Sequence, residues 1–171
     1  MNCWKFGLTV GLFAIIVPAA RAGQSVYTAT HGPSCVDHSR AELGAWRCPG
    51  PKGYVAEYTD EGNLAGISIR APTAKRQVSL SISWRGSGKV FGDMLEWRVD
   101  AGQPKAVMLR RWRVETAVDG AEHEVEELLL LKVLRAGACS VASINARQAG
   151  ANQMAQEQSE RVSSLPCLKE E

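Results

Sequence analysis

The chain has 171 residues, of which 45% are hydrophobic and 22% charged, with 20 basic and 18 acidic side chains. This length suits one globular domain that can bury its own core. A net charge of only +2 argues against nucleic-acid binding driven by bulk charge.

The first 22 residues have the pattern of an export signal. Lys5 precedes an uncharged, mostly apolar run over residues 6–20, and Ala20-Arg21-Ala22 places small residues where a signal peptidase inspects them. The run contains Pro18 and is shorter than the roughly 20 residues that a membrane-spanning helix needs. We therefore expect a signal peptide over residues 1–22 and a single exported domain over residues 23–171, periplasmic or secreted and without a membrane span.

Export also limits the chemistry of the mature protein. The signal peptide takes Lys5 and Arg21 with it, so the 18 remaining basic residues face 18 acidic ones. ATP, nicotinamide cofactors and reduced thiols are not typical of the compartments outside the cytosol. No cofactor and no nucleic-acid partner is predicted.

Period-two alternation dominates the middle of the chain and predicts half-buried strands. Residues 23–34 lack this pattern and are expected to form a poorly fixed end. Residues 54–59 and 64–70 flank the turn sequence Asp-Glu-Gly-Asn and predict a hairpin. Further strands are predicted where apolar residues alternate with polar ones, over residues 78–84 and 95–99.

A second hairpin is predicted over residues 106–116 and 121–134, around Asp119-Gly120. A two-residue turn at this dipeptide pairs Val114 with Val125 and Arg113 with Glu126, both favourable cross-strand partners. The same register places Glu115 opposite Glu124, which is unfavourable. The hairpin register is therefore predicted only to within one residue.

Four cysteines remain after export: Cys35, Cys48, Cys139 and Cys167. Their spacing alone permits three pairings. A strand from Cys139 followed by an antiparallel helix of about 14 residues returns the chain to Cys167, just after the helix-stopping Pro166. This predicts a Cys139–Cys167 disulfide and leaves Cys35 to pair with Cys48.

Metal binding is the alternative for the first cysteine pair. His31, Cys35, His38 and Cys48 are suitable ligand types, and Cys35 and His38 have a two-residue gap that zinc sites use. The interval from His38 to Cys48 fits no zinc pattern, and thiols of exported proteins tend to oxidise. We expect a disulfide and no metal.

Together these elements predict an α+β domain. About seven strands form an antiparallel sheet, and one C-terminal helix packs on it. The sequence does not decide whether this sheet closes into a barrel. Alanines at helical spacing, Ala151 and Ala155, with Met154, Val162 and Leu165 near the same face, would form the buried side of that helix.

Every tryptophan after residue 22 is followed by arginine, at Trp46-Arg47, Trp84-Arg85, Trp97-Arg98 and Trp112-Arg113. Neighbours on a strand point to opposite faces, so an inward indole places its arginine outward. These guanidinium groups are either solvated and paired across strands, or form a basic surface that binds carboxylate or phosphate groups. The predicted binding residues are Arg98, Arg110, Arg111 and Arg113.

A set of short motifs resembles a group of small exported proteins of Gram-negative bacteria. The motifs are Cys48-Pro49-Gly50 with Gly53-Tyr54, Glu96-Trp97-Arg98, Pro104 with Ala106 and Arg110, Cys139-Ser140-Val141, Ala151 with Ala155, and Pro166-Cys167. The resemblance implies a periplasmic setting and agrees with the Cys139–Cys167 pairing. The group brings no assigned activity and no catalytic residues.

No catalytic constellation stands out. Gly86-Ser87-Gly88-Lys89 is an incomplete phosphate loop, because Val90 replaces the required hydroxyl residue. We expect a non-catalytic binding or accessory protein of the bacterial cell envelope, with an unidentified envelope component or protein as its partner. The alternatives are an inhibitor of an envelope-degrading hydrolase such as lysozyme, with the loop from Cys35 to Cys48 as the plug, and a small hydrolase.

Overall fold

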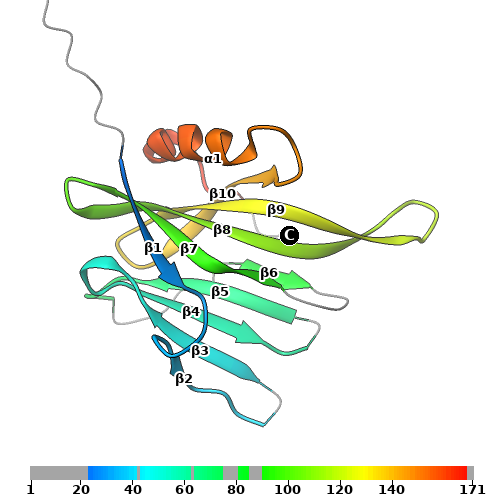
Figure 1. The fold of residues 1–171 in the computed structure, drawn as a ribbon, viewed down its shortest axis with the longest axis horizontal. Helices are drawn as coiled ribbons and strands as arrows, with labels where there is room; N and C mark the ends of the chain where they lie inside the picture. Colours follow the sequence, from blue (N-terminus) through cyan, green and yellow to red (C-terminus); the bar gives the residue numbers. More distant parts are fainter. Residues whose placement is uncertain (1–22, 42, 63, 75–80, 85–89, 169–171) are drawn as a thin grey trace, which may run out of the picture.

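The computed structural model describes residues 23–41, 43–62, 64–74, 81–84 and 90–168, and consists of two antiparallel five-stranded sheets and a helix (Figure 1). Sheet 1 has the order β1 (Gln24–Ala29), β7 (Phe91–Asp100), β8 (Gln103–Thr116), β9 (Glu122–Val133) and β10 (Ala138–Asn145). Sheet 2 has the order β2 (Val36–Asp37), β3 (Gly44–Pro49), β4 (Val55–Asp60), β5 (Leu64–Arg70) and β6 (Ser81–Trp84).

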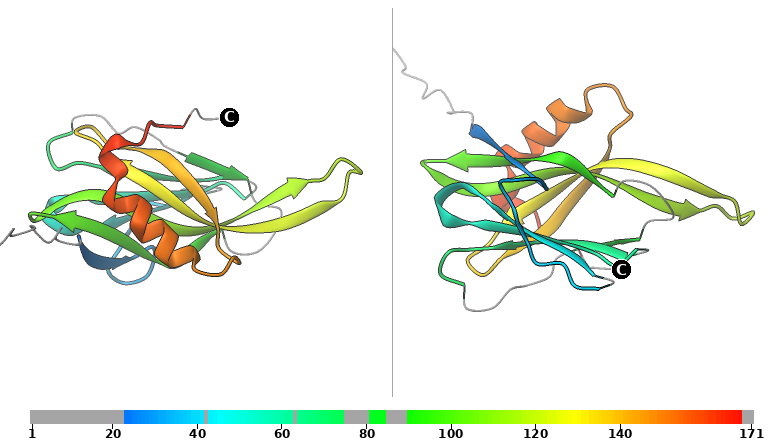
Figure 2. Two further views of the ribbon diagram at one scale, coloured as in Figure 1. Left: turned by 90° about the horizontal axis from the view of Figure 1, so that it is seen from above. Right: turned by 60° about the horizontal axis from the view of Figure 1, so that its bottom comes forward.

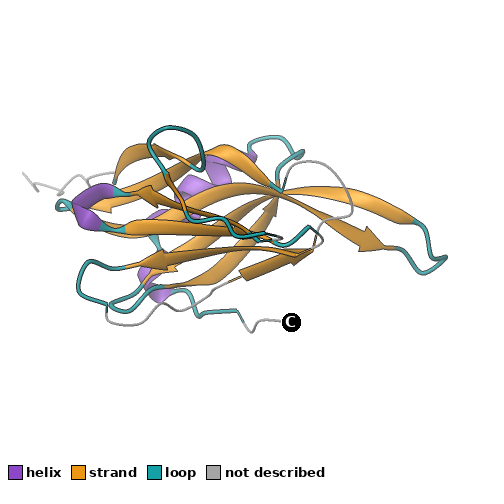
Figure 3. Ribbon diagram, turned by 90° about the horizontal axis from the view of Figure 1, so that it is seen from below, coloured by secondary structure: helices purple, strands orange, loops and turns teal. Residues whose placement is uncertain are grey.

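The molecule has three layers, with sheet 1 in the middle. Sheet 2 packs on one face of sheet 1, and helix α1 (Ala151–Glu160) packs on the other (Figures 1 and 3). The core between the sheets contains Trp97, Leu109 and Leu129 from sheet 1 and Tyr58 and Ile67 from sheet 2.

The second core lies between sheet 1 and α1. Met108 and Leu130 from the sheet pack there against Ala151 and Ala155 of the helix. The continuous apolar run over residues 128–131 of β9 fits this arrangement, since every one of its side chains is buried on one face or the other.

The coarse fold prediction is confirmed: the domain contains antiparallel sheets, one C-terminal helix and two disulfides. The predicted single sheet of about seven strands is wrong, because the described strands form two sheets and neither closes into a barrel. The predicted loose end is also partly wrong. Residues 24–29 form β1, which pairs with β7 along its whole length and turns Val26 and Thr28 inward beside Trp97 and Leu95.

The helix is shorter than predicted. It begins after Gly150, whose φ of 74° is in the left-handed region, ends at Glu160, and is followed by a 3₁₀ turn over Val162–Ser164. Ala151 and Ala155 are buried as predicted, whereas Met154 is exposed. Residues 1–22, the first three residues of the strand predicted at 78–84, residues 86–89 of the incomplete phosphate loop and Arg85 lie outside the described residues, whereas residues 81–84 form β6.

Both predicted disulfides are present, Cys35–Cys48 and Cys139–Cys167. The second is accompanied by a hydrogen bond from the Leu168 amide to the Ser140 carbonyl, 2.8 Å long, which holds the chain end against β10. The first overturns the metal alternative, because the two thiols that would ligate a metal are bonded to each other. Within the described ranges, no group of three or more metal-ligating side chains is present.

The register of the β8–β9 hairpin differs from prediction by one residue. Val114 pairs with Glu124 and Arg113 with Val125, so the predicted Val114–Val125 and Arg113–Glu126 pairs are wrong. The cause is the turn: among residues 117–121 only Gly120 has a positive φ, 83°, and the Ala117 amide bonds to the Ala121 carbonyl. Three residues, rather than two, therefore connect the strands. This hairpin reaches well beyond the rest of the molecule (Figure 2).

Candidate functional site

A pocket of about 450 Å³ opens between the two sheets, at the end of the sandwich where β1 leaves sheet 1 and β7 begins. We call it the inter-sheet pocket. Its walls include Trp46 from β3, Tyr58 from β4, and Val90 and Phe91 at the start of β7. Sheet 2 therefore supplies one side of the pocket, and sheet 1 supplies the other.

The aromatic wall follows from strand register. Trp46 and Tyr58 are directly opposite each other on β3 and β4, so both side chains project from the same face of sheet 2. The Tyr58 ring meets the Phe91 ring from sheet 1 with centroids 5.7 Å apart, a common separation for a packed aromatic pair. Trp46 is only half-buried.

Tyr58 is the polar group of this wall that lacks a partner. Its side chain is 3% exposed, and its hydroxyl has no hydrogen-bond partner among the described residues. Burial raises the pKa of the Tyr58 phenol far above its ordinary value. The buried hydroxyl therefore stays protonated at neutral pH.

The rim of the pocket is polar and includes Thr30, His31 and Asp60. The Thr30 hydroxyl donates to the Gly92 carbonyl at 2.7 Å and lies 3.1 Å from His31 Nδ1. His31 Nε2 is 3.6 Å from an Asp93 carboxylate oxygen. The order of groups is the one found in hydroxyl-histidine-acid hydrolases.

The hydrogen bonds do not activate Thr30 as a nucleophile. Because its proton points to the Gly92 carbonyl, Nδ1 of His31 must donate to the Thr30 oxygen, and this nitrogen cannot also accept the hydroxyl proton. Thr30 is also 4% exposed, whereas His31 is in contact with solvent. In this arrangement the contacts among Thr30, His31 and Asp93 hold the side chains at the pocket rim in place.

The predicted binding arginines are each held by carboxylates. Arg98, which is 9% exposed, contacts Glu160 of α1, and Arg110 contacts Glu126. Both lie on the face of sheet 1 that also carries α1. The predicted outward position of Arg98 is thus correct relative to Trp97, but the helix covers that face.

Arg111 and Arg113 share one carboxylate. Nε of Arg111 is 3.0 Å from Glu127, and Nη2 of Arg113 is 2.9 Å from the same group and also contacts Glu115. Burial alone would raise the pKa of the Glu127 carboxyl, but the two guanidinium groups outweigh it and hold this pKa below its ordinary value. A ligand at these arginines would have to displace carboxylates that already hold them, and their binding role stays a prediction.

Alternation along β8 separates the four residues further. Arg110 and Arg111 are neighbours on one strand and so point to opposite faces of sheet 1. The structure therefore places the arginines in two groups.

The residues of the inter-sheet pocket were not predicted, because their proximity depends on how two sheets pack. The one available signal for the pocket was the pairing of Trp46 with Tyr58 across the neighbouring strands β3 and β4.

No family model matches the chain, and no curated protein or solved structure shows significant similarity to it.

Proposed function

We propose that the protein is an exported, non-catalytic binding protein of the bacterial cell envelope, and that its inter-sheet pocket holds a small, mainly apolar ligand. The observation that carries this proposal is the pocket itself. Its volume of about 450 Å³ lies within the range of roughly 300–1,000 Å³ that is usual for small-molecule sites, and such sites combine apolar walls with a few polar groups.

The wall chemistry defines the ligand class. Trp46, Phe91 and Val90 offer an apolar surface to a ring or a short hydrocarbon chain. Tyr58 lines the same wall, but its hydroxyl is buried and has no partner among the described residues, so the pocket meets Tyr58 through its ring. The polar rim at His31 and Asp60 suits a hydrated end of the same molecule.

Export is the second part of the proposal. It is supported by the sequence pattern of residues 1–22 and by the two disulfides, which are typical of oxidising compartments. No helix among the described residues has both the length and the apolar character to cross a bilayer. The resemblance to small exported proteins of Gram-negative bacteria points to the same compartment.

The test is ligand capture by the oxidised protein that starts at residue 23. The protein is incubated with an envelope extract and measured by native mass spectrometry, and an uncharged naphthylamine dye serves as a fluorescent probe of apolar sites. We expect a bound small molecule and dye binding that falls at least about tenfold in Trp46→Ala. Tyr27→Ala, on the opposite face of sheet 1, is the matched control. Equal dye binding by wild type and Trp46→Ala would reject the pocket as the site.

One observation favours a second candidate function, inhibition of an envelope-degrading hydrolase. The loop closed by Cys35–Cys48 is exposed over residues 36–41 and is braced by the disulfide and by paired hydrogen bonds between Arg40 and Leu43. A rigid, exposed loop is suited to insertion into an enzyme cleft. Purified protein that leaves the rate of lysozyme-driven cell lysis unchanged would exclude this class for lysozyme.

A further inference from the structure

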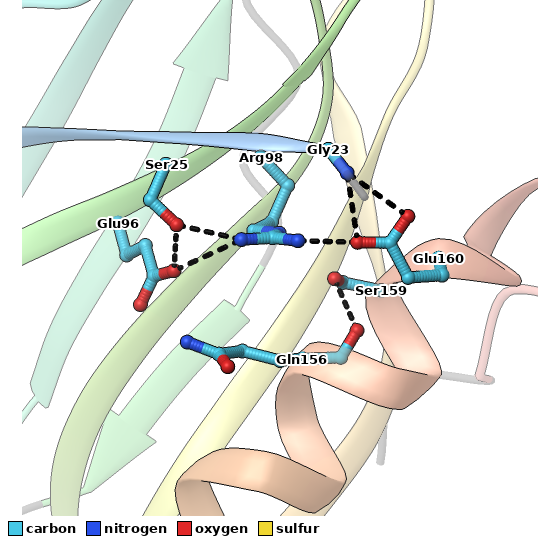
Figure 4. A network of polar contacts seen from close by, with 7 residues as sticks. All are labelled: Gly23, Ser25, Glu96, Arg98, Gln156, Ser159 and Glu160. Atoms are coloured by element: carbon cyan, nitrogen blue, oxygen red, sulfur yellow. Dashed lines mark hydrogen bonds and ion pairs between the residues drawn. The ribbon is translucent and has the colours of Figure 1, made fainter. Parts of the chain in front are cut away.

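The start of β1 and the end of α1 are joined by a network of charges (Figure 4). The backbone nitrogen of Gly23 lies 3.1 and 3.3 Å from the two carboxylate oxygens of Glu160. Arg98 from β7 contacts the same carboxylate. The Glu160 carboxylate thus bonds both to Gly23, the first described residue of the chain, and to the nearly buried guanidinium of Arg98.

The network continues along β7 and β1. Arg98 Nη1 donates to the Ser25 hydroxyl at 2.6 Å, and this hydroxyl donates to Glu96 at 2.6 Å. Arg98 and Glu96 are also 3.6 Å apart. The connected charges are therefore two carboxylates and one guanidinium, which leaves one negative charge without a counterpart in the network.

Gly23 is the residue that follows the predicted cleavage bond after Ala22. We propose that the α-ammonium group freed by removal of residues 1–22 is the second cation of this network, where it binds Glu160 and fastens β1 to α1. Maturation then completes the tertiary structure as well as releasing the protein. This inference rests on the export part of the proposed function.

Three physical features support an ammonium group at this position. Its charge brings the network to neutrality. It carries three donors in place of the single amide proton, so both Glu160 oxygens can be bonded at once. Glu160 is the last residue of α1, where the helix dipole disfavours a carboxylate, and nearby cations offset that cost.

The position of the cleavage bond also bears on the order of cleavage and docking of β1. β1 begins at Gln24, only one residue beyond Gly23. A peptidase must hold the chain on both sides of the bond it cuts, and it cannot do so while β1 is paired with β7. Cleavage therefore requires β1 to be undocked, and when β1 docks in the cut chain the ammonium group takes the place that the Gly23 amide has in the network.

The contribution depends on pH in a defined direction. A free α-amine has a pKa of about 7.7–8.0. It bonds to Glu160 from α1, and the network beyond that carboxylate contains Arg98 and Glu96 from β7 and Ser25 from β1. Because the net charge of these groups is negative, the folded-state pKa of the amine lies above its unfolded value. The added stability is present below that unfolded value and is lost as the pH rises through the folded one.

The experiment compares the chain that begins at Gly23 with the same chain carrying an acetyl group on that nitrogen. Denaturant unfolding is measured at pH 7 and pH 10, with Glu160→Gln in both forms. At pH 7 we expect acetylation to raise the unfolding equilibrium constant about fivefold. We expect no acetylation effect at pH 10 and none in Glu160→Gln. Glu157→Gln is the control, because Glu157 is exposed on α1 about one turn before Glu160. This variant should retain the full effect of acetylation.

Protein recovered from its host is sequenced from the N-terminus to separate the two proposals. A mature chain that starts at Gly23 but shows no acetylation effect overturns the inference and leaves export standing. A chain that keeps residues 1–22 overturns both. An acetylation effect of equal size in wild type and Glu160→Gln also overturns the inference, because the amine would then act elsewhere.

Discussion

Tyr58→Phe should make the protein more stable. The substitution removes one oxygen and keeps the ring, which is 3% exposed and packs against Phe91. A buried polar group without a partner costs about 1–3 kcal/mol in the folded state, and the Tyr58 hydroxyl has no partner among the described residues. We expect the free energy of unfolding to rise by about 1 kcal/mol, at the low end of that range.

Thermal and denaturant unfolding measure this change directly. For a domain of this length, 1 kcal/mol corresponds to an increase in Tm of about 3 °C. Tyr27→Phe is the control, since Tyr27 is 56% exposed and its hydroxyl is hydrated in both states. A loss of 1 kcal/mol or more in Tyr58→Phe would refute the reasoning, because it would show that the hydroxyl is bonded in the folded protein.

The same variant is also informative at alkaline pH. Alkaline unfolding provides an independent measure. Burial raises the pKa of the Tyr58 phenol, so folded stability declines as the pH rises through the unfolded tyrosine value of about 10. Tyr58→Phe should weaken that decline.

Three further substitutions test other parts of the fold. Gly50→Ala should lower the free energy of unfolding by about 1–3 kcal/mol, because its Cβ would lie 2.4 Å from the buried Trp97 ring; an unchanged denaturation midpoint would contradict this. Ala101→Asn should raise it by about 0.5–1 kcal/mol, since Ala101 has a φ of 47° in the β7–β8 turn and precedes Gly102. Glu127→Gln should be most destabilising at neutral pH and lose its effect as the pH falls through the lowered folded pKa, as denaturation at pH 7 and pH 3 would show.

The local elements were predictable because their patterns are short-range. The hairpin of β4 and β5 follows from alternation and a turn sequence, and the Cys139–Cys167 bridge follows from the lengths of one strand and one helix. The β8–β9 register was not predictable, because Asp-Gly suits both a two-residue turn and a three-residue turn with glycine last. The difference is one residue, and it moves Glu115 from Glu124 to His123.

The division into two sheets was harder to predict, because it depends on long-range packing. β1 is short and only Val26 and Thr28 mark its inner face, so its place beside β7 is set by contacts with Trp97 and Leu95. For the same reason the inter-sheet pocket has no sequence signature: its walls come from strands on both sheets.

The placement of the arginines shows that each of them already has a carboxylate partner on sheet 1 or α1. β9 is apolar over residues 128–131 and acidic at Glu126 and Glu127, next to Arg110 and Arg111 on β8. On the face that carries α1, apolar side chains are buried under the helix at one end and Glu126 pairs with Arg110 at the other. On the opposite face of sheet 1, Glu127 pairs with Arg111. With these arginines held in ion pairs, the inter-sheet pocket of about 450 Å³ is a better candidate for recognition than the pocket of about 130 Å³ that Arg110 lines beside α1.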